Sequence, residues 1–256
     1  MRRVVFNQKG GVGKTSITCN LAAISASRGK RTLVIDLDTQ ANSTQYLLGD
    51  AEYDCSIADY LDQKVGFFEV AKPVNEFVFQ TEFDNLFIMP ACKRLPEIEH
   101  KLESRYKIFA LKKALKALEE FYDEIYIDTP PALNFYTKSA LIATDSVLIP
   151  FDCDAFSKSS LESVSSAIFE IKEDHNENLA IEGVIVNQFQ PRAKLPLQLV
   201  NELIEAGYPV LTSMLTSSVK MKESHQQSCP LIHFAPKHNL TKQFEILYDE
   251  LNHVPQ

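Results

Sequence analysis

Short apolar runs alternate with longer amphipathic stretches along the chain. Six of the runs have the length and the Val/Ile content of strands that are buried on both faces. These are Val4–Phe6, Thr32–Ile35, Leu86–Met89, Glu124–Ile127, Ser146–Ile149 and Ile181–Val186. Apolar residues at helical spacing mark five further stretches, Lys14–Arg28, Pro96–Phe121, Ser157–Glu173, Leu195–Ala206 and Leu240–Leu251. The alternation predicts an α/β fold with a doubly wound, mostly parallel sheet that is flanked by helices.

The domain organisation follows from the same pattern. Residues 50–85 are acidic and rich in Phe, and strand and helix signals mix there, so we expect an irregular excursion before the strand at Leu86. The chain contains no internal repeat, low-complexity tract or Pro/Gly/Ser linker. A length of 256 residues suits one large α/β domain. We therefore predict a single domain over residues 1–256.

Composition and charge exclude several classes of protein. The apolar fraction of 45% and the charged fraction of 23% are ordinary for a globular protein, which excludes disordered and fibrous classes. The net charge of −8 argues against a protein coated in basic residues. The acid is concentrated in residues 51–100, 151–187 and 243–256, whereas residues 1–50 and 188–242 are net positive. An anion is therefore expected to dock at one of the two positive segments.

The cysteines and the apolar runs bear on the compartment. The five cysteines are odd in number and contain no CxxC pair, which favours reduced, buried thiols over a disulfide framework. No apolar run approaches the roughly 18–20 residues that span a bilayer. The sequence therefore predicts a cytoplasmic protein.

The first predicted strand leads into the string NQKGGVGKTS at residues 7–16, and a predicted helix follows it. Glycines allow backbone N–H groups to close around phosphate oxygens, and the start of the helix adds its positive end. Lys14 can reach the β- and γ-phosphates, and Thr15 can hold Mg²⁺. The usual phosphate-loop pattern has glycine where Gln8 stands, and an incidental glycine turn is the alternative interpretation. The predicted nucleotide-binding residues of the loop are Lys9, Gly10, Gly11, Val12, Gly13, Lys14, Thr15 and Ser16.

Two acidic motifs stand at predicted strand ends. Asp36 and Asp38 follow the run that starts at Thr32, and Asp128 follows the run that starts at Glu124. Because the carboxyl ends of parallel strands meet at the ligand crevice, these carboxylates are expected near the phosphate loop. Phosphoryl transfer needs a cation against the phosphate oxygens and an oriented water. Asp128 suits the Mg²⁺ shell, Asp36 its water-mediated outer shell and Asp38 a water-positioning role, although each aspartate alone also fits a strand-end turn.

These motifs carry a family resemblance. NQKGGVGKTS at 7–16, DLDTQANST at 36–44 and DTPPA at 128–132 resemble the deviant phosphate-loop ATPases of the ParA/MinD family, and most closely the short chromosomal ParA type. The resemblance implies a P-loop NTPase fold, the cofactors ATP and Mg²⁺, and a homodimer that forms with ATP.

Further site residues follow from the resemblance. It implies that Lys9 reaches across the dimer to the partner's nucleotide, that Asp38 positions the attacking water, and that Pro130–Pro131 belong to a switch segment that senses the γ-phosphate. Thr39 stands where the family commonly has Pro. Asn187 fits the position from which related ATPases hydrogen-bond adenine. A turn-forming asparagine at a strand end is the alternative for Asn187.

The resemblance also implies a cellular role. Short ParA proteins hydrolyse ATP slowly, are stimulated by a cargo-linked protein and position a chromosome locus, a plasmid or a large protein assembly through nonspecific DNA binding. That activity would associate the protein with the nucleoid. The residues that fall roughly where the family places its DNA contacts are Arg192, Lys194, Lys220 and Lys222. An ordinary solvated face is the alternative for these four residues.

The two ends of the sequence help to distinguish between types of ParA/MinD protein. A membrane-targeting relative would end in a basic amphipathic helix. Here the segment Phe244–Leu251 is acidic, which argues against membrane binding. The phosphate loop begins at Lys9, so we expect no DNA-reading extension before it.

Other functions stay open at this level. A metabolic P-loop ligase or kinase of the dethiobiotin-synthetase type would use ATP to activate a small substrate and would not need Lys9 in trans. A binding switch that hydrolyses almost nothing is a third hypothesis. The series His225, Cys229, His233 and His238 invites a metal site. We do not expect one, because Pro230 and Pro236 interrupt any helix that would align these side chains.

Overall fold

A central sheet organises the molecule. The computed structural model describes residues 1–64, 70–154, 157–190 and 193–252. Its strands are β1 (Arg2–Val5), β2 (Thr32–Asp36), β3 (Phe79–Gln80), β4 (Leu86–Met89), β5 (Glu124–Asp128), β6 (Ser146–Asp152) and β7 (Ala180–Asn187). They form a seven-stranded sheet in the order β3-β4-β2-β5-β1-β6-β7, in which β3 is antiparallel to β4 and the other pairs are parallel. The predicted fold class is confirmed.

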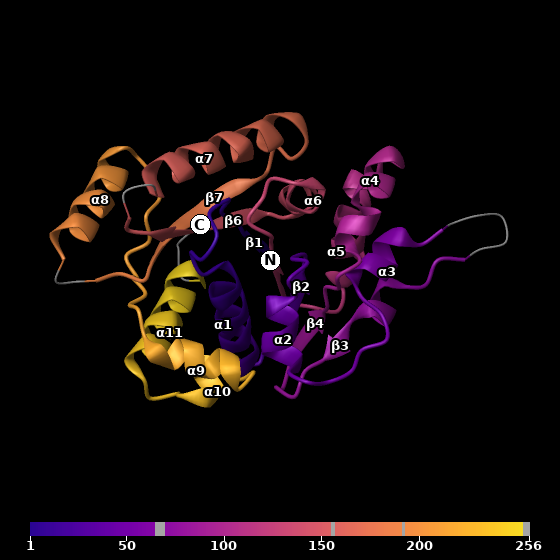
Figure 1. Ribbon diagram of the computed structural model, residues 1–256, viewed down its shortest axis with the longest axis horizontal. Coiled ribbons are helices and arrows are strands. Elements are labelled where there is room, and N and C mark those ends of the chain that lie inside the picture. Colours follow the sequence, from indigo (N-terminus) through magenta and orange to yellow (C-terminus); the bar gives the residue numbers. More distant parts are fainter. Residues whose placement is uncertain (65–69, 155–156, 191–192, 253–256) are drawn as a thin grey trace.

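Helices cover both faces of this sheet (Figure 1). They are α1 (Lys14–Ser27), α2 (Asn42–Leu48), α3 (Ile57–Asp62), α4 (Leu95–Ser104), α5 (Ala110–Leu118), α6 (Phe135–Ala143), α7 (Ser157–Asp174), α8 (Lys194–Glu205), α9 (Val219–Gln226), α10 (Leu231–Phe234) and α11 (Asn239–Asn252). Two short 3₁₀ turns, η1 (Val74–Phe77) and η2 (Lys107–Phe109), lie between them. Figure 1 shows α1, α2 and α9–α11 on one side of the sheet and α4–α7 on the other.

The two larger hydrophobic clusters follow from the alternation of side chains along each strand. Val4 and Phe6 pack into the core on the side of α4–α7, whereas Val5 packs into the core beside α1 and α11. In β5, Ile127 belongs to the first core and Tyr126 to the second. Because both faces are covered, the strands are apolar almost throughout, which is why the six long strands could be predicted from sequence.

One predicted helix is wrong. The stretch Pro96–Phe121 is divided between α4, η2 and α5, with Tyr106 in the left-handed region at φ 52°. A continuous helix would place Arg105 and Tyr106 on the same face as the buried Leu102. The break rotates the chain instead, so that Tyr106 is 90% exposed while Leu111 is buried.

Several elements were not predicted. Helices α2, α6, α9 and α10 are short or carry polar residues, and β3 spans only two residues. The described part of residues 50–85 contains α3, η1 and β3 joined by irregular segments, in agreement with the expected excursion. The described residues include no helix that is long and apolar enough to cross a membrane. All five cysteines are free, but only Cys19 is fully buried, so the expectation of buried thiols holds for one residue.

A buried charged cluster lies at the start of β1 and was also missed. Arg3 is 1% exposed and donates to Glu182 from Nε at 2.9 Å and from Nη2 at 2.8 Å. Nη1 also donates to the Tyr126 hydroxyl at 3.3 Å and lies 3.7 Å from Glu124. Nη2 reaches the carbonyl of Leu251 at 3.3 Å, so this one side chain joins β1 to α11.

The substitution Arg3→Ala tests this cluster. It leaves Glu182 without its buried cation and Glu124 with Lys30 alone, so we expect the free energy of unfolding to fall by about 3–5 kcal/mol. Urea denaturation followed by circular dichroism measures the change. The matched control is Arg28→Ala, which removes a half-exposed ion pair with Asp249 and should cost about 1 kcal/mol or less. Equal losses for the two variants would contradict the role given to Arg3.

Candidate functional site

The phosphate loop connects β1 to α1 and depends on two glycines. Gly11 and Gly13 lie in the left-handed region, at φ 78° and 95°. A Cβ atom at Gly13 would stand 2.2 Å from Nδ2 of Asn187. Glycine is therefore required at Gly13 both by the backbone and by the close approach of β7.

Lys14 is the first residue of α1, and its ammonium group is held inside the loop. The side chain is buried, and Nζ donates to the carbonyl of Lys9 at 3.1 Å. Burial lowers the pKa of Lys14 below its ordinary value, and the negative charges of Asp128 and Asp38 oppose this shift. The two carboxylates therefore lie on the same side of the loop as the Lys14 ammonium group.

Asp128 links the loop to the end of β5. Its Oδ2 accepts hydrogen bonds from the hydroxyls of Thr15 and Ser43, both at 2.7 Å. Its Oδ1 is buried and has no hydrogen-bond partner among the described residues. Burial raises the pKa of Asp128 above its ordinary value, although both hydroxyl hydrogen bonds lower it. A buried acceptor oxygen next to the Thr15 hydroxyl fits a Mg²⁺ ion or a water bound to that ion.

Asp36 lies beside Asp128 in the sheet, at the end of β2. Oδ2 accepts from the backbone N–H and the hydroxyl of Thr44 at 2.9 and 2.8 Å, and Oδ1 accepts from the N–H of Asp38 at 3.0 Å. Burial, and after it the charge of Asp128, raises the pKa of Asp36. Both oxygens therefore already accept hydrogen bonds that hold the turn after β2.

Asp38 lies in that turn. It is 8% exposed, and its Oδ1 accepts from the backbone N–H of Gln40 at 3.0 Å. The Pro130–Pro131 turn follows Asp128 and Thr129, and the Thr129 hydroxyl donates to the carbonyl of Val5 at 2.8 Å. The turn after β2 and the turn after β5 thus stand on the same edge of the sheet as the phosphate loop.

Lys9 binds two carboxylates of its own chain. Its Nζ donates to both oxygens of Asp152 at 2.8 and 2.7 Å and also to Asp154. Burial alone would lower the pKa of Lys9, but the hydrogen bonds to Asp152 and Asp154 raise it. The Lys9 ammonium group is therefore charged and held at the end of β6, next to the loop.

A cavity of about 210 Å³ lies beside the loop. It is lined by Gly11, Gly13, Ser16, Asn187, Gln188, Thr216, Ser217, Ser218, Met221, Lys222, His225 and Leu240. Asn187 donates through Nδ2 to the carbonyl of Val12 at 2.8 Å, so it is tied to the loop as well as to β7. The structure brings Asn187 to the same site as the phosphate loop, although the two are far apart in sequence.

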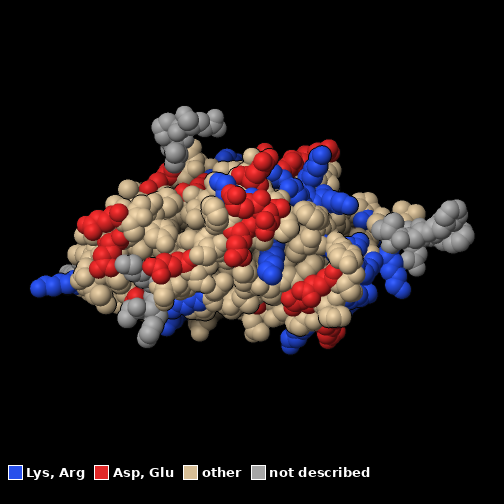
Figure 2. Space-filling view, turned by 90° about the horizontal axis from the view of Figure 1, so that it is seen from above, with Lys and Arg blue, Asp and Glu red and all other residues tan. Residues whose placement is uncertain are grey.

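The three candidate DNA contacts that the structure describes lie on two helices. Arg192 lies outside the described residues. Lys194 is exposed at the start of α8, whereas Lys220 and Lys222 lie on α9. Lys220 pairs with Glu223 at 2.6 Å and lies 5.6 Å from the centre of the Phe234 ring. Figure 2 views the molecule from above and shows acidic and basic side chains interspersed on that face.

Four polar residues of the site were missed from the sequence. Ser43 and Thr44 lie in the DLDTQANST string, where only the aspartates were given roles. Asp152 and Asp154 follow the strand that was predicted to end at Ile149. The signal for the second pair was present, because carboxylates at the end of a buried strand are the same pattern that identified Asp128.

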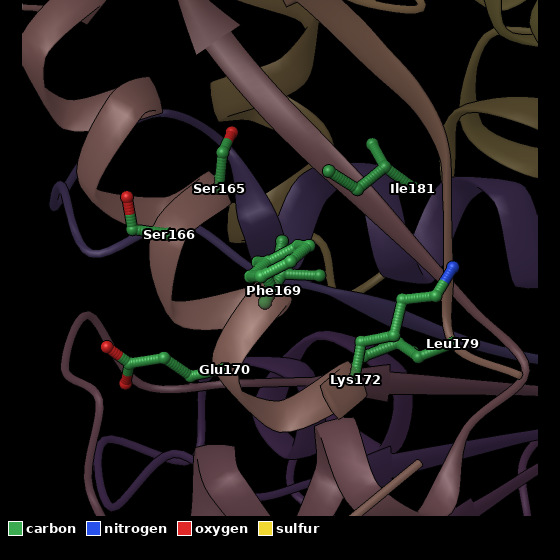
Figure 3. A pocket seen from close by; sticks show the side chains of 8 residues that line it. Ser165, Ser166, Phe169, Glu170, Lys172, Leu179 and Ile181 are labelled. Atoms are coloured by element: carbon green, nitrogen blue, oxygen red, sulfur yellow. The ribbon is translucent and has the colours of Figure 1, made fainter. Parts of the chain in front are cut away.

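A second hollow, of about 660 Å³, lies between α7 and the chain around Leu179 and Ile181 (Figure 3). Phe169, which is 62% exposed, stands in its centre, and the charged groups of Glu170 and Lys172 point apart. None of the residues that line it belongs to the phosphate loop. Among the described residues, no group of three or more His, Cys, Asp or Glu side chains is placed to hold a metal ion.

Comparison with known proteins gives the family. The family model described as an AAA domain matches residues 3–181. The sporulation initiation inhibitor protein Soj of Bacillus subtilis is 32% identical over 236 residues, which cover 91% of this chain and 90% of Soj. The chromosome partitioning protein ParA of Myxococcus xanthus is 33% identical over 238 residues, which cover 89% of this chain and 79% of that protein.

Solved structures share the fold. An ATP complex of McdA from Cyanothece superposes with a TM-score of 0.86 at 23% identity and covers 100% of this chain and 97% of McdA. Cobyrinic acid a,c-diamide synthase of Mycobacterium smegmatis, with a bound ATP analogue and magnesium, gives a TM-score of 0.83 at 23% identity over 97% of this chain and 92% of the synthase. The cell division ATPase MinD of Pyrococcus furiosus gives 0.78 at 23% identity, over 98% of each chain. The sequence matches and the phosphate-loop geometry together establish that the chain belongs to the ParA/MinD family of P-loop ATPases.

Proposed function

We propose that this protein is an ATPase that dimerises with ATP and positions or segregates a cargo by binding DNA nonspecifically. The observation that carries the proposal is the arrangement of one phosphate loop with two lysines. Lys14 is buried beside Asp38 and Asp128, whereas Lys9 is held at the rim by Asp152 and Asp154. We assign Lys14 to the nucleotide of its own chain. Lys9 would exchange its contacts with Asp152 and Asp154 for contacts with the nucleotide of the partner subunit.

Phosphate and metal binding follow from the loop. The backbone N–H groups of the loop and the start of α1 would bind the phosphates, and the Lys14 ammonium group would add a positive charge for the β- and γ-phosphates. The Thr15 hydroxyl and the buried Oδ1 of Asp128 would hold Mg²⁺, directly or through water. When bound, Mg²⁺ supplies positive charge against the phosphate oxygens. Asp36 would contact Mg²⁺ only through water. Its hydrogen bonds with Asp38 and Thr44 fix the turn after β2.

Hydrolysis needs a water molecule aligned with the γ-phosphate. Asp36 and Asp128 each accept two or more hydrogen bonds in the described part of the chain, whereas the Asp38 carboxylate accepts one, from the N–H of Gln40. Its second oxygen can accept a hydrogen bond from a water. The Pro130–Pro131 turn would sense the γ-phosphate, because it directly follows Asp128 and is fixed to β1 by Thr129.

Lys9 would act on the nucleotide of the partner. A cation supplied by the second subunit makes the stabilisation of the γ-phosphate depend on dimerisation, in the manner of an arginine finger. Asp152 and Asp154 then hold the ammonium group of Lys9 in the single chain until the phosphates of the partner's ATP replace them. The ammonium group of Lys9 would keep anionic partners in this exchange, whereas Asp152 and Asp154 would lose their contact with it.

DNA binding and stimulation by a partner complete the proposal. The relatives named Soj and ParA include chromosome partitioning proteins. Lys194 and Lys220 offer positive charge on α8 and α9, and a dimer would double that charge. We infer that a cargo-linked protein stimulates slow hydrolysis, as the resemblance to short ParA proteins implies.

The experiment that tests this function measures ATP turnover and DNA retention together. We expect the protein to retard duplex DNA of any sequence only with ATP, and its turnover to rise with DNA and a cargo-linked protein. DNA retention should fall steeply with added salt. Turnover that responds to a small metabolite and not to DNA would instead support a ligase of the dethiobiotin-synthetase type. Near-zero turnover under all conditions would support a binding switch.

Lys9→Ala should separate binding from hydrolysis. We expect ATP binding to persist, because Lys14 remains, and turnover to fall at least about tenfold with loss of the ATP-dependent dimer. Equilibrium binding of ATP, light scattering and phosphate release measure the three properties. Lys14→Ala is the comparison, since it should lose ATP binding as well. Wild-type turnover in Lys9→Ala would refute the role in trans.

Asp38→Ala should trap the ATP-bound dimer. Loss of the water-positioning carboxylate is expected to lower turnover about a hundredfold or more while ATP binding continues. Size-exclusion chromatography with ATP should therefore show a dimer that persists for hours. A protein that stays monomeric with ATP would argue against the role assigned to Asp38.

Asp128→Asn should weaken metal-dependent binding without destabilising the free protein. The amide oxygen can still accept from Thr15 and Ser43, but the charge for Mg²⁺ is lost, so the affinity for Mg²⁺-ATP should fall about tenfold or more. The raised pKa of Asp128 means that its ionised form costs stability as the pH rises above the usual carboxyl range. At pH 8 the ligand-free variant should thus unfold at the same temperature as the wild type or higher. A clearly lower unfolding temperature would contradict this account.

A further inference from the structure

The cavity beside the phosphate loop lies on the side away from the hydrolytic carboxylates. Its lining includes Gly11, Gly13 and Ser16 of the loop, but not Lys14, Asp38 or Asp128. The β- and γ-phosphates belong with Lys14 on the carboxylate side. The cavity is therefore where the rest of the nucleotide, its α-phosphate, ribose and base, can extend.

Helix α9 forms one wall of this cavity. Lys222 and His225 both line it, and a separation of three residues places them on one face of α9. His225 Nε2 lies 3.1 Å from the hydroxyl of Ser16, in the first turn of α1. His225 thus reaches the loop from a segment more than two hundred residues away in sequence, and Lys222 faces the same cavity.

Buried contacts fix α9 in this position. The Tyr46 hydroxyl and Ser224 Oγ of α9 are hydrogen-bonded at 2.9 Å, and Asn20 Nδ2 of α1 donates to the same Tyr46 hydroxyl at 3.2 Å. The ring of Tyr46 meets the ring of His225 edge to face, with 4.4 Å between their centres. The wall is therefore built onto α1, the helix that carries the phosphate loop.

The charge of Lys222 has no ion-pair partner among the described residues. Lys220, two residues earlier, pairs with Glu223 at 2.6 Å. Lys222 is exposed and forms no ion pair with any residue in the described ranges. A cation that faces a cavity next to a phosphate loop gains most from an anionic ligand in that cavity.

We propose that Lys222 and His225 bind the nucleotide from α9, with Lys222 as the countercharge of the α-phosphate and His225 at the ribose side of Ser16. The inference rests on the proposed binding of ATP. It assigns Lys222 to the nucleotide site and leaves Lys194 and Lys220 as the described candidates for DNA. Because ADP and ATP share the α-phosphate and the ribose, both nucleotides use this wall.

Calorimetric titration with Mg²⁺-ADP, in the absence of DNA, tests the proposal. We expect Lys222→Ala to weaken ADP binding about threefold to tenfold, and Lys222→Arg to recover most of the loss because it keeps the charge. Lys242→Ala is the matched control. It removes an exposed lysine of α11 that does not line the cavity, and its affinity should stay within about twofold of the wild type.

His225 is tested by two substitutions, because loss of its ring contact with Tyr46 could loosen α9. His225→Ala should weaken ADP binding by a similar factor, and His225→Gln, which can still bond Ser16, should weaken it less. Thermal unfolding of both variants controls for the fold. An alanine variant that unfolds at the wild-type temperature and binds ADP with wild-type affinity contradicts the role of His225.

The outcomes separate this inference from the proposed function. If the wild-type protein binds Mg²⁺-ADP and Lys222→Ala binds it equally well, the inference is wrong and ATP binding stands. If Lys222→Ala loses DNA retention instead, Lys222 belongs to the DNA surface and the inference is likewise wrong. If the wild-type protein binds neither ADP nor ATP, the proposed function itself fails.

Discussion

The hydrogen bond from Thr15 to Asp128 joins two segments that are 113 residues apart, and the site is built around it. It can form because β1 and β5 are adjacent and parallel, with Val5 directly opposite Asp128. Parallel pairing brings the end of β5 to the same edge as the loop that leaves β1. The same edge receives the turn after β2, since β2 pairs with β5 on its other side. The phosphate loop, the proposed metal ligands and the proposed water-positioning carboxylate therefore lie together as one consequence of strand order.

That assembly concentrates negative charge. Asp36, Asp38 and Asp128 are all buried, and burial raises the pKa of Asp36 and Asp128. Lys14 is the cation that faces them, and burial lowers its own pKa. The buried part of the site therefore contains more negative than positive charge. In addition, no group donates a hydrogen bond to Asp128 Oδ1 in the described chain. The Mg²⁺ ion that would bind with the nucleotide brings positive charge to these carboxylates, and this gives metal binding a physical reason beyond the match of motifs.

The sequence predicts the sheet and the loop because both depend on local patterns: buried runs for the strands, and glycines with a lysine between a strand and a helix for the loop. What it does not predict depends on which segments meet. The cis pairing of Lys9 with Asp152, the burial of Arg3 and the wall that α9 makes beside Ser16 each join residues more than one hundred positions apart. The prediction of one helix over Pro96–Phe121 is wrong because its apolar residues do not all lie on one face of a continuous helix. The chain instead forms α4 and α5 with η2 between them.

The central claim is that Lys9 leaves the carboxylates of its own chain and completes the site of the partner. Mixing two inactive variants, Lys9→Ala and Asp38→Ala, and measuring phosphate release tests it most directly. In a mixed dimer, the Lys9→Ala subunit keeps Asp38 at its nucleotide and receives Lys9 from the other subunit, so we predict turnover well above the sum of the separate variants. If Lys9 acted only within its own chain, each site of the mixed dimer would lack one residue. A mixture with no recovered turnover would contradict the account.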